Sequence, residues 1–78
     1  MYMSLETAIT ERVKEILHEK NKTGYNLYIS SGLAKSTVYD IIAGTKKRIS
    51  VLSIKEICSA LDITLSEFFN SPLFENLD

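Results

Sequence analysis

The sequence contains one cysteine, one proline, three glycines and no tryptophan among its 78 residues. A single cysteine excludes an internal disulfide, and no apolar run approaches the ~18 residues that a membrane-spanning helix needs. The opening stretch, MYMSLETAIT, lacks the basic and apolar regions of a secretory signal peptide. These absences favour a cytoplasmic protein. The length suits one small domain with a single core, and a hydrophobic content of 45% argues against disorder.

Few helix-breaking residues interrupt the chain, and its pattern predicts five helices and no strands. We expect a first helix from about Leu5 to Lys20, a second from near Thr23 to Gly32, a third that Gly44 ends, a fourth that Ser50 caps and a fifth from Thr64 to Phe69. Residues 1–78 thus form one domain, with a helical part over 4–70. Residues 71–78, SPLFENLD, are expected to be a short acidic and apolar tail, because Pro72 disfavours helix continuation.

Charge is distributed unevenly along the chain, although the net charge is only −1. Residues 12–48 carry eight Lys and Arg against three acidic residues, a net charge of +5, and residues 49–78 carry −4. Association with a charged partner follows the local field more than the total. The middle of the chain is therefore the expected contact region for an anionic partner such as nucleic acid.

The third expected helix, in SGLAKSTVYDIIAG, has two different faces. At about 100° per residue, Thr37, Val38, Ile41 and Ile42 gather on one side, which is suited to burial. A cation, hydroxyls, an aromatic ring and an acid occupy the opposite arc: Lys35, Ser36, Tyr39 and Asp40. This mixture is unusual for a merely solvated helix face.

Two short helices joined by a glycine-containing turn are the helix-turn-helix arrangement. The chain resembles the phage-repressor-like (XRE-type) helix-turn-helix family over roughly Ile9 to Phe69. The resemblance rests on three segments in order and on the spacings between them: ITERVKEILHEKNKT, SGLAKSTVYDIIAGTKK and SVLSIKEICSALDITLSEFF. It implies an all-α, compact five-helix bundle, a lambda-repressor-like DNA-binding domain whose third helix enters the major groove.

Several positions depart from the pattern of that family. Gly24 stands where a phosphate-contacting Gln is usual, Tyr28 where a small residue is usual, and Ala34 where Ser or Thr often caps the third helix. Some relatives bury an Arg–Glu pair where this chain has Leu17 and Ile42, which are therefore expected to make a direct aliphatic contact. Such a contact avoids the desolvation cost of a buried ion pair.

The resemblance places base contacts at Lys35, Ser36, Tyr39 and Asp40, and their chemistry fits. A Lys ammonium can donate hydrogen bonds to guanine, a Ser hydroxyl can donate or accept, and an Asp carboxylate can accept from cytosine. The Tyr ring can pack against a thymine methyl group, or the Tyr hydroxyl can bind a phosphate. Asp40 also repels phosphate and could instead act against wrong sites. Phosphate contacts are expected from Lys46, Lys47 and Arg48, with a lesser site at Lys22 and Thr23, where a helix begins. The alternative reading is an ordinary exposed helix face and a solvated charge run.

The remaining reactive side chains have structural explanations. Cys58 is expected in the core, His18 on the surface without a metal, and Tyr25 and Tyr28 in packing rather than in base stacking. No catalytic motif or glycine-rich phosphate loop is present, so neither an enzyme nor a cofactor is expected.

The leading functional hypothesis is a sequence-specific double-stranded-DNA binder, a small prokaryotic or phage transcriptional regulator that acts as a homodimer. The alternative is a protein-binding module, such as an antitoxin or anti-repressor, that grips a partner through Leu73, Phe74 and Leu77. The same three residues could form the dimer contact, or the tail could simply be frayed. A chain this short leaves no room for a separate ligand-binding domain, so no small-molecule ligand or membrane is expected.

Overall fold

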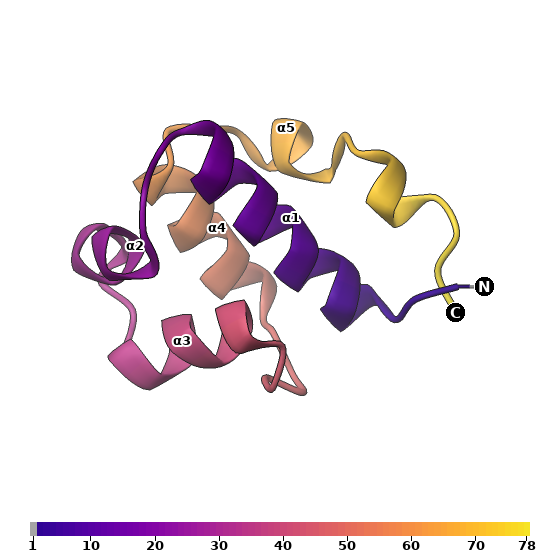
Figure 1. Cartoon of the computed structure of the whole chain (residues 1–78), viewed down its shortest axis with the longest axis horizontal. Helices are drawn as coiled ribbons and strands as arrows, with labels where there is room; N and C mark the ends of the chain where they lie inside the picture. Colours follow the sequence, from indigo (N-terminus) through magenta and orange to yellow (C-terminus); the bar gives the residue numbers. More distant parts are fainter. Residues whose placement is uncertain (1) are drawn as a thin grey trace.

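Five α-helices and one 3₁₀ turn make up the fold in a computed structural model, which describes residues 2–78. The elements are α1 (Leu5–Glu19), α2 (Gly24–Ser31), α3 (Lys35–Ala43), α4 (Val51–Ala60), α5 (Leu65–Phe69) and the 3₁₀ turn η1 (Pro72–Phe74). Figure 1 shows α3 along the lower edge of the molecule and the two chain ends together at one side. The all-α architecture with five helices confirms the prediction. No helix within this part of the chain is long and apolar enough to cross a membrane.

Side-chain caps explain where four of the five helices begin. Ser4, Thr23, Ser50 and Thr64 each accept a hydrogen bond from the backbone N–H three residues later. The Thr64 N–H in turn donates to the Glu67 carboxylate at 2.9 Å, and this hydrogen bond lowers the pKa of Glu67 below its usual value. The capping predicted for Ser50 is therefore confirmed.

One hydrophobic core joins all five α-helices. Its buried members share near-zero exposure and include Ile9, Val13, Ile16, Leu17, Leu27, Val38, Ile41, Ile54, Ile57, Cys58, Leu61 and Phe68. Thr10 adds a polar link, because its buried hydroxyl donates to the Ile41 carbonyl at 2.7 Å and ties α1 to the end of α3. The core assignment of Val38, Ile41 and Cys58 is confirmed.

Leu17 and Ile42 are both part of this core, although to different degrees. Leu17 is buried, with 6% of its surface exposed, whereas Ile42 is partly buried and packs against the cluster. Neither side chain points to solvent. An apolar pair therefore occupies the place where some relatives are expected to bury opposite charges, and the direct contact between the two remains a prediction.

Arg12 connects α1 to the C-terminal end of α5. Its guanidinium donates to the carbonyls of Phe68 at 2.7 Å and Glu67 at 2.8 Å, and it pairs with Glu15 at 2.5 Å. Only 14% of the Arg12 side chain is exposed. A cation suits this place, because the unpaired carbonyls at the end of a helix carry partial negative charge.

Replacing Arg12 by Met should destabilise the domain by about 1–3 kcal/mol, because the Phe68 carbonyl loses its donor in a partly buried place. Denaturant unfolding measures this loss. The matched control is Lys14→Met on the same helix, whose ammonium lies 3.3 Å from Glu11 at the surface. That change should cost less than about 1 kcal/mol. Equal losses in the two variants would show that Arg12 acts only as a surface charge.

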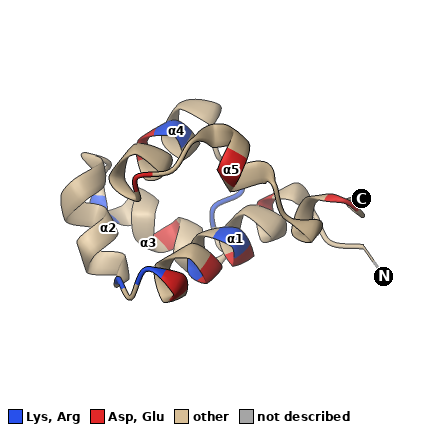
Figure 2. Ribbon diagram, turned by 90° about the horizontal axis from the view of Figure 1, so that it is seen from above, with Lys and Arg blue, Asp and Glu red and all other residues tan. Residues whose placement is uncertain are grey.

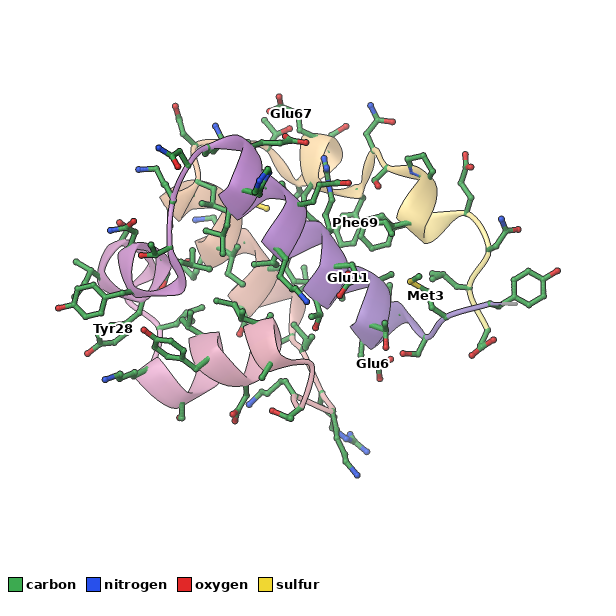
Figure 3. All side chains as sticks on the ribbon, in the orientation of Figure 1. Met3, Glu6, Glu11, Tyr28, Glu67 and Phe69 are labelled. Carbon is green, nitrogen blue, oxygen red and sulfur yellow. The ribbon has the colours of Figure 1, made fainter. Side chains whose placement is uncertain are left out.

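The C-terminal segment folds back onto the body of the molecule. Pro72 begins the 3₁₀ turn η1, which packs against α1, and Phe74 lies 5.0 Å from Phe69 and 6.0 Å from Phe68 between ring centroids. Leu77 then forms a parallel β-bridge with Met3, which Figure 3 shows beside the returning chain. Leu73, Phe74 and Leu77 are all partly buried. The three residues expected to contact a partner are therefore partly buried by contacts within the chain itself, where the C-terminal segment packs against α1.

Candidate DNA-binding interface

A three-residue turn sets the angle between α2 and α3. Gly32 ends α2 in the left-handed conformation, with φ of +75°, which a residue with a side chain rarely adopts. The buried Ser31 hydroxyl accepts from the Leu33 N–H at 3.2 Å, and Leu33 packs against the core. This geometry holds α3 across α2, with the outer side of α3 directed to solvent (Figure 1).

The outer face of α3 presents all four side chains predicted to contact bases. Lys35, Ser36, Tyr39 and Asp40 are exposed, while Val38 and Ile41 on the opposite face are buried. The Lys35 ammonium lies 5.8 Å from the centre of the Tyr39 ring, within the range of a cation–π interaction. The structure thus brings a cation and an aromatic ring together at the start of α3. Their contacts with bases remain a prediction.

The beginning of α3 offers polar donors that the side-chain pattern does not reveal. Ala34 provides no side-chain cap, and the first backbone hydrogen bond into the helix is that of the Val38 N–H to the Ala34 carbonyl. The N–H groups of Lys35, Ser36 and Thr37 have no acceptor within residues 2–78. The only signal for this in the sequence is the absence of Ser, Thr, Asp or Asn at the cap position.

The start of α2 lies close to the middle of α3 because Gly24 has no side chain. A Cβ atom at Gly24 would lie 2.9 Å from the Cδ1 atom of Ile42 and 3.6 Å from the Cε1 atom of Tyr39. The departure from the usual Gln at this position therefore gives room to two α3 side chains. The Tyr39 ring of α3 therefore lies next to the start of α2.

The lesser phosphate site predicted at Lys22 and Thr23 is partly occupied within the chain. The Thr23 N–H donates to the Asn26 side chain at 2.9 Å, and the Thr23 hydroxyl accepts from the Asn26 N–H at 3.1 Å. Lys22 is exposed. Because Thr23 uses its N–H in this capping box, only its hydroxyl hydrogen and the Lys22 ammonium can still reach a phosphate from these two residues.

The basic loop after α3 is anchored to the helix that precedes it. Gly44 turns the chain in the left-handed conformation, and the N–H groups of Thr45 and Lys46 donate to the Asp40 carbonyl at 2.9 Å and 3.3 Å. Lys47 and Arg48 are exposed, and Lys46 is partly buried. Figure 3 shows the loop that follows α3 extending, with its side chains, away from the rest of the molecule.

Not every cation in the basic middle of the sequence is available to a partner. Arg12 is engaged by carbonyls and Glu15, and Lys14 pairs with Glu11. Figure 2 shows this mixture of basic and acidic positions along α1. Arg12 and Lys14 therefore add little to the positive charge that a partner meets, although both count toward the excess of +5 over residues 12–48. The exposed cations of α3 and of the loop that follows it are Lys35, Lys47 and Arg48.

The other reactive residues lie where packing puts them. Cys58 is buried, and burial raises the pKa of its thiol, an effect that the nearby Arg12 charge opposes. His18 is exposed, and no cluster of His, Cys, Asp or Glu in the described chain could hold a metal. Tyr28 packs against the core as expected. Tyr25 is not part of this packing. Its surface is 56% exposed, and its ring centroid lies 6.0 Å from that of Tyr28.

Comparison with known proteins agrees with this geometry. The family model of the Cro/C1-type helix-turn-helix DNA-binding domain matches residues 12–72. The chain is also similar to a solved structure, the crystal structure of the prophage Lp1 protein 11, with 25% identity and a TM-score of 0.82 over 96% of this chain and 99% of that chain. No curated protein matches the sequence. The match over most of the domain, together with α2, the turn and α3, shows that the chain belongs to the Cro/C1-type helix-turn-helix family of DNA-binding domains.

Proposed function

We propose that this protein is a sequence-specific binder of double-stranded DNA, a small, cytoplasmic, repressor-like transcriptional regulator of prokaryotic or phage origin that acts as a homodimer. The observation that carries the proposal is the outer face of α3, which presents Lys35, Ser36, Tyr39 and Asp40 to solvent beside the basic loop. A helix of this kind fits the major groove, where each base pair shows a distinct pattern of donors and acceptors.

In this proposal, α3 reads bases and the surrounding backbone groups and loop cations hold phosphates. The Lys35 ammonium donates to guanine, and its position over the Tyr39 ring limits the directions in which it can point. The unpaired N–H groups at the start of α3 add donors for a phosphate, since the start of a helix attracts anions. Lys46, Lys47 and Arg48 follow the backbone beside the groove without reading its sequence.

The Lys35→Ala and Tyr39→Ala variants should lose binding to a preferred duplex far more than to random duplex. The expected loss is about 1–3 kcal/mol for each good base contact, with relaxed choice at one or two positions. Lys46→Ala and Lys47→Ala should weaken all sequences together, and the slope of log affinity against log salt should fall by about one unit for each phosphate that the variant no longer binds. The preferred duplex comes from selection out of a random pool, and binding is measured across a salt series.

Two controls make this comparison decisive. Lys14→Ala removes a cation whose charge Glu11 already balances, so it should leave both affinities nearly unchanged. Tyr39→Phe keeps the ring beside Lys35 and Gly24 but removes the hydroxyl, so it separates a ring contact with a thymine methyl from a hydroxyl contact with a phosphate. If the α3 and loop variants gave one common pattern, the division between base reading and phosphate binding would be wrong.

The same titration tests the alternative of a module that binds only protein. Such a module should show little duplex binding at any salt concentration, whereas a DNA binder loses affinity steeply as salt rises. The tail that this alternative requires is engaged against α1, Phe68 and Met3. The packing therefore favours the DNA-binding proposal.

A further inference from the structure

Gly24 is the one glycine of the chain whose backbone conformation does not need glycine. Gly32 and Gly44 have φ angles of +75° and +80°, whereas Gly24 opens α2 without a positive φ. In a helix, glycine is less favourable than alanine, because glycine has more conformational freedom to lose on folding. The neighbours of Gly24 on α3 supply a steric reason for glycine instead.

Two side chains of α3 border the space that a side chain at position 24 would enter. A Cβ atom there would lie 2.9 Å from the Cδ1 atom of Ile42, closer than the optimal ~3.5–4.0 Å between two carbon atoms. The same Cβ would lie 3.6 Å from the Cε1 atom of Tyr39, which is an ordinary contact. Ile42 packs against the core, so its terminal methyl group has little room to move. A branched side chain at position 24 would therefore compete with the Tyr39 ring for space.

The Tyr39 ring has support from two directions. The Lys35 ammonium lies 5.8 Å from the centre of the ring, within the range of a cation–π interaction. The Cε1 atom that lies near Gly24 is bonded to the ring carbon that carries the hydroxyl, so the hydroxyl end of the ring lies at the start of α2. Tyr39 is 38% exposed. The ring is thus held beside α2, with part of its surface open to a partner.

We propose that Gly24 determines sequence specificity without touching a base, because its missing side chain lets Tyr39 keep the position from which the ring meets one base pair. The inference rests on the proposed function, in which α3 lies in the major groove. A group that is held in place before binding loses less freedom on binding, and it adapts less readily to a different base pair. Gly24 is therefore a positioning residue that acts through Tyr39.

The test compares the affinities of Gly24→Val for the duplex that the wild-type chain prefers and for random duplex. The ratio of the two affinities should fall at least about fivefold, and the base pair whose preference is relaxed should be the one that Tyr39→Ala relaxes. Partial unfolding would lower both affinities by the same factor, so it would leave this ratio unchanged. The matched control is Ser30→Val, at an exposed position of the same helix, which should keep the ratio of the wild type.

Double variants test whether Gly24 acts through its neighbours on α3. Added to Tyr39→Ala, Gly24→Val should leave the ratio where Tyr39→Ala alone puts it, because the ring that the valine displaces is already gone. The smaller change Gly24→Ala adds only the Cβ atom, so the ratio should fall less than in Gly24→Val. Combining Gly24→Ala with Ile42→Val, which removes the Cδ1 atom at 2.9 Å, should restore the ratio.

Three results would each overturn this role of Gly24: an unchanged ratio in Gly24→Val, an equal fall in Ser30→Val, or a further fall when Gly24→Val is added to Tyr39→Ala. The binding of the wild-type chain separates this failure from failure of the proposed function. If the wild-type chain binds no duplex at any salt concentration, the proposed function fails and the role of Gly24 fails with it. If the wild-type chain prefers its selected duplex and Gly24→Val keeps that preference in full, only the role of Gly24 fails.

Discussion

Truncation of Phe68 to Ala should remove most of the stability of the domain. Phe68 has no exposed surface and is among the largest fully buried side chains, with the Phe69 ring edge-on at 5.0 Å and the Phe74 ring at 6.0 Å. Phe-to-Ala changes in a core cost about 3–5 kcal/mol, and native domains typically have about 5–15 kcal/mol in total. We expect the midpoint of urea unfolding to fall sharply.

The matched control for this change is its neighbour in the sequence. Phe69 is 39% exposed on α5, so Phe69→Ala should cost clearly less than Phe68→Ala. Because α5 is only five residues long, its place depends on this aromatic cluster more than on its own helical hydrogen bonds. Similar losses for the two variants would mean that the partly exposed Phe69 contributes as much to the stability of the domain as the buried Phe68 does.

Leu17→Ala should give the second large loss, about 2–5 kcal/mol. Leu17 is 6% exposed and belongs to the buried core, so its truncation leaves a cavity there. Leu5→Ala on the same helix is the control, because Leu5 is 47% exposed and its truncation should cost within about 0.5 kcal/mol. Thermal and denaturant unfolding of the two variants measure the difference. Equal effects would place Leu17 outside the packed interior.

The helices could be predicted from the sequence because their ends are locally encoded. Ser50 and Thr64 cap helices through bonds to residues three positions away, and Gly32 and Gly44 adopt the left-handed conformation that ends a helix. The buried side of α3 could be predicted in the same way, from the helical spacing of its apolar residues. These features depend on neighbours in the chain, so a single sequence contains them.

The features that escaped prediction depend on distant partners. Arg12 looks like a free cation in the sequence, but its partners at Glu67 and Phe68 are 55 and 56 residues away. The C-terminal tail is too short to show a repeating pattern of apolar residues. Its apolar side chains pack only once α1 and α5 have formed a surface. At the interface, the exposed side of α3 was predictable, whereas the anchoring of the loop by the Asp40 carbonyl uses a backbone atom that every residue possesses.

The pairing of segments from opposite ends of the fold has a consequence for synthesis. Met3 joins Leu77, and Arg12 joins the end of α5, so α1 leaves the ribosome well before the segment that completes its contacts. Closing loops of this length costs entropy before any contact compensates it, and such contacts slow folding even in helical proteins. A nascent chain that has reached only α4 therefore exposes one side of α1, and the domain closes when residues 67–77 have emerged.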